Sequence, residues 1–417
     1  MRVLVLLLIA CCAAAAATAS PSATEALAGL QAVLDRRYKC NETWMRAYAA
    51  KHEQLLPVRR LVHVPFLSGL ADRIIGLVTS TAFAVLIDRA IQSGKRPPLP
   101  PLEGLFTSPF GVNWTRGYDE EWLLDVLKDK ANPRQYNASV LSAGEFTAVH
   151  TLNDYKLLDK FLRQDINQIF GDKVRNVMFL MNRGKTIRLF ENTHYAKRLT
   201  DDMQLTPDTA FGCICNFMLR PKPEIFSSDP VLVPMLHKLS SPEASKVLKI
   251  AIQIRAGDAV LIKDTAEVAH FASYFKCAEE IEQWAKTDPA QEVLWYLATD
   301  SKRLREFAAA KYGSKLVTSL TAKIEHSSKE SNTGCTTNCS VSHAGFQHAA
   351  AEWWMMGACD YFVITLNSGY GRSAAMRSLR GAQAIYTIRE DRRKPMHVCS
   401  NTTYTDLENL SYDWSGI

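Results

Sequence analysis

Val247–Asp258 reads Val-Leu-Lys-Ile-Ala-Ile-Gln-Ile-Arg-Ala-Gly-Asp, and this stretch decides the fold. Six of its first eight residues are apolar or β-branched, which predicts a strand that is buried on both faces. The apolar run then breaks at Arg255, Gly257 and Asp258. In open α/β sheets, ligands bind at the carboxyl ends of the strands, and the planar guanidinium of an arginine can hold a phosphate or carboxylate there. We therefore expect Arg255 to bind an anionic ligand.

Apolar runs alternate with helix-competent segments on the C-terminal side of this strand. The further strands that we expect are Glu292–Ala298, Lys315–Ser319, Tyr361–Thr365 and Ala384–Ile388, with helices at Ala266–Lys286 and Ser342–Ala358. This alternation is typical of a doubly wound parallel sheet.

Polar clusters follow two of these strands as well, so that three strand ends carry polar side chains at one edge of the predicted sheet. The clusters are Thr299-Asp300-Ser301 and Asn367-Ser368-Gly369-Tyr370-Gly371-Arg372. Glycines allow the backbone to approach a ligand closely, and a helix that follows them can point its amides at an anion. The alternative interpretations are a helix cap at Asp300, an ordinary tight turn at 368–372 and a structural ion pair between Arg255 and Asp258.

The N-terminal half of the chain repeats the pattern of strand, glycine turn and helix. We expect an amphipathic segment at 24–50, strands at Arg60–Val64 and Val174–Met181, and helices at Leu70–Ile91, Glu121–Lys130 and Asn153–Gly171. Asp72 and Arg73 lie on the first turn of a helix, where an acidic residue is usually just a favourable partner for the helix dipole. The polar, proline-containing segment Pro221–Pro242 is the expected boundary between domains at 20–240 and 241–417.

Length and composition indicate an ordinary globular protein of two domains. The chain has 417 residues, and 47% of them are hydrophobic, which is ample for two cores. The formal charge of +6 comes from scattered rather than clustered residues, so nucleic-acid binding is not indicated.

The first 19 residues have the features of a cleaved secretory signal peptide. One arginine precedes the apolar run Val3–Ala17, and Ala17-Thr18-Ala19 gives an Ala-x-Ala cleavage pattern before Ser20. The alternative is an uncleaved signal anchor, because the run reaches the lower length limit of a spanning helix. Only in that case do we expect the protein to be held in a membrane.

Cysteines and glycosylation sequons agree with a secretory protein. Ten cysteines are present, and eight remain once Cys11 and Cys12 leave with the leader, which predicts disulfide bonds of unknown pairing. Zinc is disfavoured, because Cys213-x-Cys215 and Cys335-x-x-x-Cys339 lack the usual ligand spacing. Asn-x-Ser/Thr sequons stand at Asn41, Asn113, Asn137, Asn338, Asn401 and Asn409.

Five segments resemble, in the same order, segments of the plant-type xyloglucan fucosyltransferases. They are Gly69–Gly76, Glu103–Phe110, Phe211–Pro221, Ile252–Arg255 and Glu352–Gly371. The first is similar to the family's Gly-Leu-Gly-(Asn/Asp)-Arg segment, and the fourth to its arginine motif. The wider group, which includes α-1,6 and protein O-fucosyl enzymes, has a similar arginine motif, a Thr-Asp strand end and a late serine loop with an arginine. Two departures are Ala71, which stands where a glycine is usual, and Arg372, at a position that varies among plant-type members.

The resemblance implies a GT-B architecture, in which two Rossmann-like domains face a cleft and the C-terminal domain binds most of the nucleotide. It also implies an enzyme of the Golgi or ER lumen, or a secreted one, that transfers L-fucose from GDP-β-L-fucose to a glycan acceptor hydroxyl. The transfer is expected to proceed with inversion and without a metal or other cofactor. The sequence agrees independently in one respect, because it contains no Asp-x-Asp pair, which metal-dependent transferases commonly use to hold a cation on the diphosphate.

Side-chain cations must then neutralise the departing diphosphate. The expected donor-binding residues are Gly69, Arg73, Gln253, Arg255, Asp300, Ser301, Ser368, Gly369, Tyr370, Gly371 and Arg372. Arg255 is the expected catalytic residue, and Arg372 with the amides of 368–372 assists it where negative charge develops. Asp300 and Ser301 are expected to contact guanine or ribose.

The base that accepts the proton of the acceptor hydroxyl is less well defined. Asp72 and Asp258 are the candidates, unless the transition state is so dissociative that no strong base is needed. His326 and His343 are expected to be structural or solvated. Glu352 is expected on its helix, either near the cleft or as a surface residue.

Two alternatives remain from the sequence. Within the enzymes, the chain is a protein O-fucosyltransferase or uses another sugar nucleotide. Outside them, it is a secreted glycan-binding protein that kept the fold without turnover. The intact Arg255, Asp300 and 368–372 loop argue against the second alternative.

Overall fold

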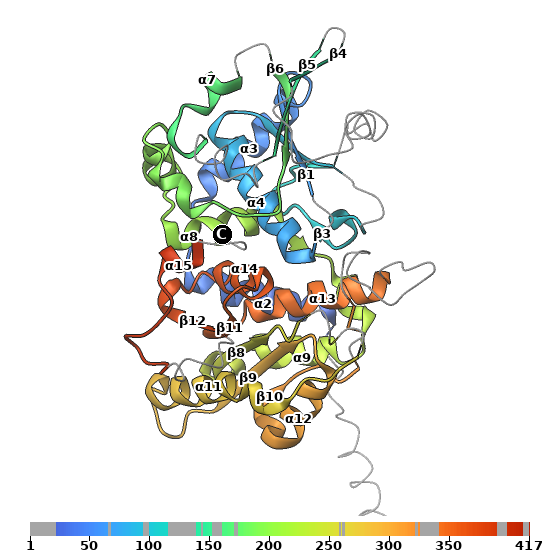
Figure 1. Ribbon diagram of the computed structural model, residues 1–417, viewed down its shortest axis with the longest axis vertical. Coiled ribbons are helices and arrows are strands. Elements are labelled where there is room, and N and C mark those ends of the chain that lie inside the picture. The colour runs from blue at the N-terminus through green and yellow to red at the C-terminus, as the bar shows by residue number, and fades with distance from the viewer. Residues whose placement is uncertain are drawn as a thin grey trace, which may run out of the picture.

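The computed structural model has two lobes, each built around a five-stranded sheet (Figure 1). It describes residues 22–65, 68–94, 100–115, 139–142, 145–151, 161–170, 174–257, 260, 263–321, 324–325, 342–389, 398–411 and 417. The predicted leader at 1–19 and the predicted helix at Glu121–Lys130 lie outside these residues.

The sheet of the lower lobe in Figure 1 is doubly wound and parallel, as the alternation of strands and helices predicted. Its order is β10-β9-β8-β11-β12, and all neighbouring strands run parallel. The strands are β8 Leu248–Ile254, β9 Val293–Thr299, β10 Leu316–Val317, β11 Tyr361–Thr365 and β12 Ile385–Ile388, and the helices are α11 Ala272–Ala285, α12 Lys302–Tyr312, α13 His343–Met356 and α14 Gly369–Arg377. The chain order reverses between β8 and β11, so the carboxyl ends of these two strands form the switch point of the sheet.

The upper sheet has the order β2-β1-β6-β5-β4 and is parallel except for β4, which runs antiparallel to β5. Its strands are β1 Arg60–Val64, β2 Ala90–Ser93, β4 Ser139–Ser142, β5 Glu145–Thr151 and β6 Val174–Leu180. The helices of this part are α3 Glu42–Leu55, α4 Leu70–Leu86, α7 Ile166–Phe170 and α8 Pro207–Met218. β1 is followed in the chain by β2, which lies on one side of it, whereas β6 lies on its other side. A second switch point therefore lies between β1 and β6.

A small antiparallel sheet joins two of the segments that resemble the plant family. Its strands, β3 Phe106–Thr107 and β7 Arg220–Pro221, pair in register. Two segments that are far apart in the sequence thus lie side by side.

Two element predictions were wrong at their boundaries. The helix expected at Leu70–Ile91 ends at Leu86, where Asp88 adopts a positive φ of 50°, and the chain then enters the fully buried strand β2. Because a buried strand and a buried helix look alike in sequence, the expected helix was continued across Asp88 and Arg89 into Ala90 and Ile91. The amphipathic segment expected at 24–50 consists of two helices, α2 Ala23–Arg37 and α3, and Asn41 caps α3. The helix expected from Ala266 begins at Ala272, after the 3₁₀ turn Val268–Phe271.

Segments cross between the lobes at both ends of the chain. Helix α2 packs against α9 Leu232–Ser240, and both lie with the lower lobe in Figure 1. The last helix, α15 Leu407–Ser411, packs against the 3₁₀ turn Ile187–Glu191 of the upper lobe. The division at residues 240 and 241 stays a prediction.

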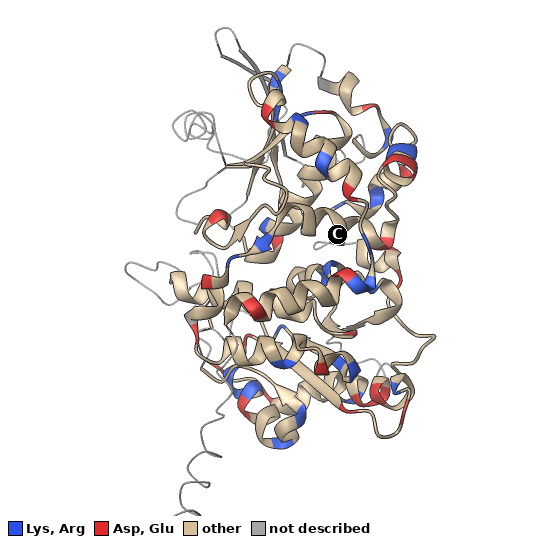
Figure 2. Ribbon diagram, turned by 180° about the vertical axis from the view of Figure 1, so that it is seen from behind, with Lys and Arg blue, Asp and Glu red and all other residues tan. Residues whose placement is uncertain are grey.

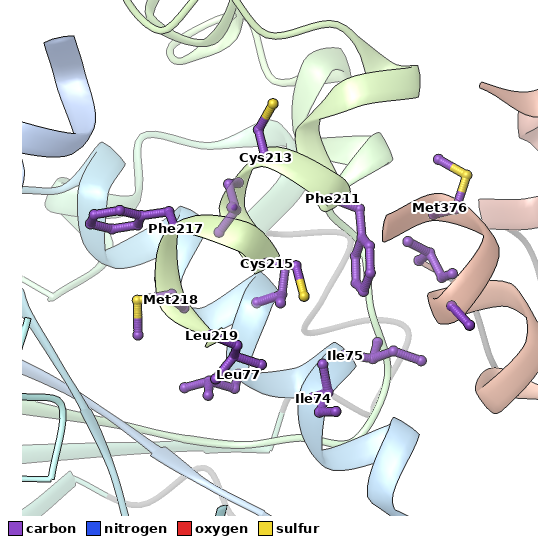
Figure 3. Packing of buried hydrophobic residues seen from close by; sticks show 14 of the residues in the cluster. Ile74, Ile75, Leu77, Phe211, Cys213, Cys215, Phe217, Met218, Leu219 and Met376 are labelled. Carbon is purple, nitrogen blue, oxygen red and sulfur yellow. The ribbon is translucent and has the colours of Figure 1, made fainter. Parts of the chain in front are cut away.

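An apolar interface joins the two lobes. Helices α4 and α8 contact α14, and the buried side chains of all three belong to one continuous core. Figure 3 shows Ile75 of α4 and Phe211 of α8 beside α14, the helix that carries Met376. A Cβ atom at Gly212 would lie 2.8 Å from the carbonyl oxygen of Met376, so only glycine permits this approach. The lobes are therefore held together by close packing.

Two disulfide bonds confirm the expectation that the cysteines pair. Cys40 is bonded to Cys213, and Cys277 is bonded to Cys399. Cys215 and Cys359 are buried thiols, and Cys335 and Cys339 lie outside the described residues. Disulfides form and persist in oxidising compartments, so this chain folds in one.

The glycosylation sequons that the structure describes are accessible. Asn113, Asn401 and Asn409 are exposed, and Asn41 is partly exposed, whereas Asn137 and Asn338 lie outside the described residues. Modification of these sites stays a prediction.

Charged residues are distributed over both lobes rather than gathered in one basic face. Figure 2 shows Lys and Arg interspersed with Asp and Glu along the described chain. Within the described residues, the helices are too short or too polar to cross a bilayer.

Candidate active site

Arg255 lies directly after β8, at the switch point of the lower sheet. Its backbone amide donates to Thr365 Oγ1 at the end of β11, over 2.9 Å. Its guanidinium pairs with the carboxylate of Asp300, and 32% of the Arg255 side chain remains exposed. The strand-end rule thus placed this arginine correctly, at the sheet edge where ligands of open α/β sheets bind.

The carboxylate of Asp300 is engaged by the loop that follows β8. Its Oδ1 accepts from the amide of Ala256 at 2.7 Å, and its Oδ2 accepts from the amide of Gly257 at 3.3 Å and from Arg255. The alternative interpretation of Asp300 as the cap of the next helix was wrong. That cap is Ser301, whose Oγ accepts from the Leu304 amide. Asp258, the alternative ion-pair partner of Arg255, lies outside the described residues.

Ser301 is held in place by a residue that the sequence analysis did not single out. Its Oγ donates to both carboxylate oxygens of Asp264, at 2.9 and 2.8 Å, and the side chain is buried. The role of Ser301 in guanine or ribose binding stays a prediction.

Polar side chains tie the ends of β8 and β11 together. The Oε1 of Gln253 accepts from the amide of Thr365 at 3.3 Å, and Tyr274 Oη lies 2.9 Å from Thr365 Oγ1. A Cβ at Gly371 would lie 2.4 Å from Gln253 Oε1 and 3.0 Å from Ile364 Cβ, so a larger residue at this position would displace the Gln253 side chain. Gln253 and Gly371 therefore shape the switch point, and their contact with a donor stays a prediction.

The loop at 368–372 forms the start of α14, with side chains that point into the protein. Ser368 caps the helix by accepting from the Gly371 amide, and Gly369 is the first helical residue. The Tyr370 hydroxyl donates to the carbonyl of Ala349 on α13 at 2.8 Å. Arg372 is fully buried, and its Nη1 donates to the carbonyl of Leu410 at 3.3 Å. The expected contact of Arg372 with a diphosphate stays a prediction.

Asp72 approaches this edge from the other lobe. It lies on the first turn of α4, after the glycine N-cap Gly69, and interacts electrostatically with Arg183 and Arg255. Burial raises the pKa of Asp72 to about 6, and a hydrogen bond from Gly69 and the two arginines oppose that rise. The carboxylate of Asp72 thus lies within electrostatic reach of one arginine from each lobe, Arg183 and Arg255.

Arg183 is the functional candidate that the sequence analysis missed. It follows β6, the strand next to β1, and its side chain is buried. The strand Val174–Met181 was predicted, so the rule that found Arg255 could have found Arg183.

Arg73 faces a different part of the molecule from Asp72. Its guanidinium lies 5.2 Å from the centroid of the Phe346 ring on α13 and interacts with Glu103. Burial lowers the pKa of Arg73 to about 10. Consecutive residues on a helix point about 100° apart, so the side chains of Asp72 and Arg73 extend in different directions and do not contact one ligand group in the same way. Donor binding by Arg73 stays a prediction.

Glu352 lies on its helix as expected, but the alternative that it is a surface residue was wrong. This side chain is fully buried in the lower lobe, where it pairs with Arg305 of α12 at 2.6 and 2.8 Å. His343 is exposed at the start of α13, and His326 lies outside the described residues. Glu352 therefore forms a buried ion pair that stabilises the lower lobe.

Comparison with known proteins identifies the fold. No protein-family model and no curated sequence matches the chain. Among solved structures, a point mutant of Arabidopsis thaliana FUT1 in complex with GDP is similar, with a TM-score of 0.58 and 16% identity over 82% of this chain and 78% of that one. The fucosyltransferase NodZ from Bradyrhizobium aligns with a TM-score of 0.43 and 11% identity, over 76% of this chain and 92% of that one. The likeness to FUT1 confirms the GT-B-like fold that the resemblance to plant-type fucosyltransferases implied.

Proposed function

We propose that this chain is an inverting fucosyltransferase that transfers L-fucose from GDP-β-L-fucose to a glycan hydroxyl without a metal ion. The observation that carries the proposal is Arg255 at the switch point of the lower sheet, with which Asp72 on helix α4 of the upper lobe interacts electrostatically. We propose that the lower lobe binds the nucleotide and that the upper lobe binds the acceptor.

The chemistry follows from these charges. As the bond between the sugar C1 and the β-phosphate oxygen breaks, negative charge grows on the GDP and positive charge on the ring. Arg255 stabilises the departing diphosphate where this charge develops. The acceptor oxygen attacks C1 from the opposite face, and Asp72 takes its proton. Because the pKa of Asp72 is raised to about 6, the carboxylate is a stronger base than an ordinary aspartate and is still ionised at pH 7.

The secretory pathway is the proposed location. Two disulfides and the exposed sequons at Asn113, Asn401 and Asn409 support a lumenal or secreted enzyme. The structure of FUT1 with GDP supports a guanine nucleotide as the donor.

The proposal is tested by incubating the protein with GDP-fucose and a mixture of glycan and protein acceptors. We expect release of GDP and a fucosylated product, at the same rate with and without EDTA. If the enzyme transfers sugar only from a different sugar nucleotide, GDP-fucose is not its donor, and that nucleotide takes its place in the proposal. Acceptor binding without release of GDP would instead favour a glycan-binding protein.

Replacing Asp72 by asparagine is expected to lower kcat by about 10²-fold or more, because the acceptor proton loses its base. For the wild-type enzyme, kcat/KM should rise with pH up to about 6 and then level off, because Asp72 is protonated below its raised pKa. The variant should lose this inflection. Asp201→Asn, at an exposed aspartate, is the matched control. An Asp72→Asn enzyme with wild-type kcat would show that Asp72 is not the base.

A further inference from the structure

We infer that Asp300 is a positioning residue, which fixes the guanidinium of Arg255 and the loop 255–257 in one orientation, rather than a ligand of guanine or ribose. This inference rests on the proposed function of Arg255. It starts from the register of the sheet, where Ile254 of β8 is paired with Thr299 of β9. Arg255 and Asp300 are the next residues of these two paired strands, so the ladder itself brings them together.

Both carboxylate oxygens of Asp300 already accept hydrogen bonds from one short loop. The donors are the amides of Ala256 and Gly257 and the Nη1 of Arg255. Only 10% of the Asp300 side chain is exposed, against 32% for Arg255. The carboxylate thus lies behind the guanidinium, and the guanidinium is the more accessible of the two groups.

The backbone of the loop is adapted to this contact. Gly257 has a φ of 107°, in a region that other residues rarely adopt, and its amide points at Asp300. A side chain beyond Cα at this position would strain the turn. The loop and Asp300 therefore form one unit, in which the carboxylate of β9 holds the strand end of β8.

Holding the arginine in advance is of direct use in the proposed reaction. An arginine side chain loses much conformational freedom when it binds a ligand, and a group fixed beforehand stabilises developing charge without reorganising. The carboxylate of Asp300 partly offsets the positive charge of the Arg255 guanidinium. The same ion pair fixes the direction in which the other N–H groups of that guanidinium point. We expect the benefit in the transition state, hence in kcat more than in KM.

A double-mutant cycle tests the inference. Asp300→Asn should lower kcat by at least about tenfold in the wild-type background and by less than about threefold in an Arg255→Lys background, because the positioned group is already altered. The affinity for GDP should fall, while the affinity for guanosine should not. Equal factors in both backgrounds, or equal losses for GDP and guanosine, would assign Asp300 to the nucleoside and overturn the inference. Asp300→Glu replaces the asparagine variant if the latter does not fold.

A second measurement needs no substrate and so separates this inference from the proposed function. Modification of Arg255 by phenylglyoxal, followed by peptide mass spectrometry, should be several times faster in Asp300→Asn than in the wild type. Asp288→Asn, an exposed aspartate of the same lobe, should leave the rate unchanged. Equal rates in all three proteins would overturn the inference, even if fucosyl transfer is found. Failure of the wild type to bind GDP would overturn the proposed function, and the labelling rates would still decide the role of Asp300.

Discussion

Arg255→Ala is expected to lower kcat by about 10²-fold to 10⁴-fold while the protein remains folded. Two charge-assisted hydrogen bonds to a diphosphate contribute about 3–6 kcal/mol together, and this stabilisation grows as the leaving group takes up charge. Arg255→Lys should fall between the wild type and the alanine variant, because lysine keeps the charge but not the planar pair of donors. Initial rates of GDP release from GDP-fucose measure both effects.

Arg303→Ala is the matched control for this prediction. Arg303 is an exposed arginine of α12 in the same lobe, so its loss removes one positive charge without touching the switch point. We expect its kcat to stay within about twofold of the wild type. An Arg255→Ala enzyme that also keeps this rate would remove the basis of the proposed function.

The lower sheet was predictable because its strands are short apolar runs that end in polar residues. The run before Arg255 is buried on both faces, as is typical of a central parallel strand, and β8 is indeed the middle strand. The same reasoning failed at the end of α4, because the expected helix was continued through Asp88 and Arg89, although these two charged residues separate α4 from β2. A local pattern reports burial more reliably than it reports the type of element.

The partners of the site residues were not predictable in the same way. Strand ends placed Arg255 and Asp300 at one edge of the sheet, but only the register of β8 and β9 shows that they bond to each other. For Arg372, the resemblance indicated a ligand-binding arginine, whereas the structure buries it beside Leu410. Side-chain direction depends on contacts between segments that are distant in the sequence, and those contacts leave no local pattern.

Glu352 is a charged residue whose burial could not be predicted from the sequence. It lies on α13 next to tryptophans and methionines. A charged residue in such an apolar run must be paired if it is buried, and this was the only indication in the sequence of an ion pair here. In the structure it forms a two-point ion pair with Arg305, and His348 lies 3.5 Å away. Arg305 also donates to the carbonyl of Thr299 at the end of β9, so the pair anchors α13 to the sheet that carries the site.

Glu352→Gln is therefore expected to lower the free energy of unfolding by about 3–5 kcal/mol at neutral pH, because it leaves the buried charge of Arg305 without its partner. Chemical denaturation of the wild type and the variant measures the difference. Glu306→Gln is the matched control, since Glu306 pairs with Lys302 on the exposed side of α12 at 3.7 Å, and it should change stability by less than about 1 kcal/mol. The double variant Arg305→Met and Glu352→Met should be more stable than Glu352→Gln, because no unpaired charge remains buried.

The same pair predicts how the stability depends on pH. Burial opposes ionisation of Glu352, but the charge and hydrogen bonds of Arg305, with His348, overcome it and lower the pKa to about 2, from 4.5 in the unfolded chain. A lowered pKa of the folded state stabilises the protein above pH 4.5, and this contribution of about 3 kcal/mol is lost as the pH falls from 4.5 toward 2. Glu352→Gln should show a shallower loss of stability over this range, because glutamine does not titrate. If the two proteins lose stability in parallel between pH 5 and 2, the ion pair is not what the acid breaks, and the destabilisation of the variant must then come from packing alone.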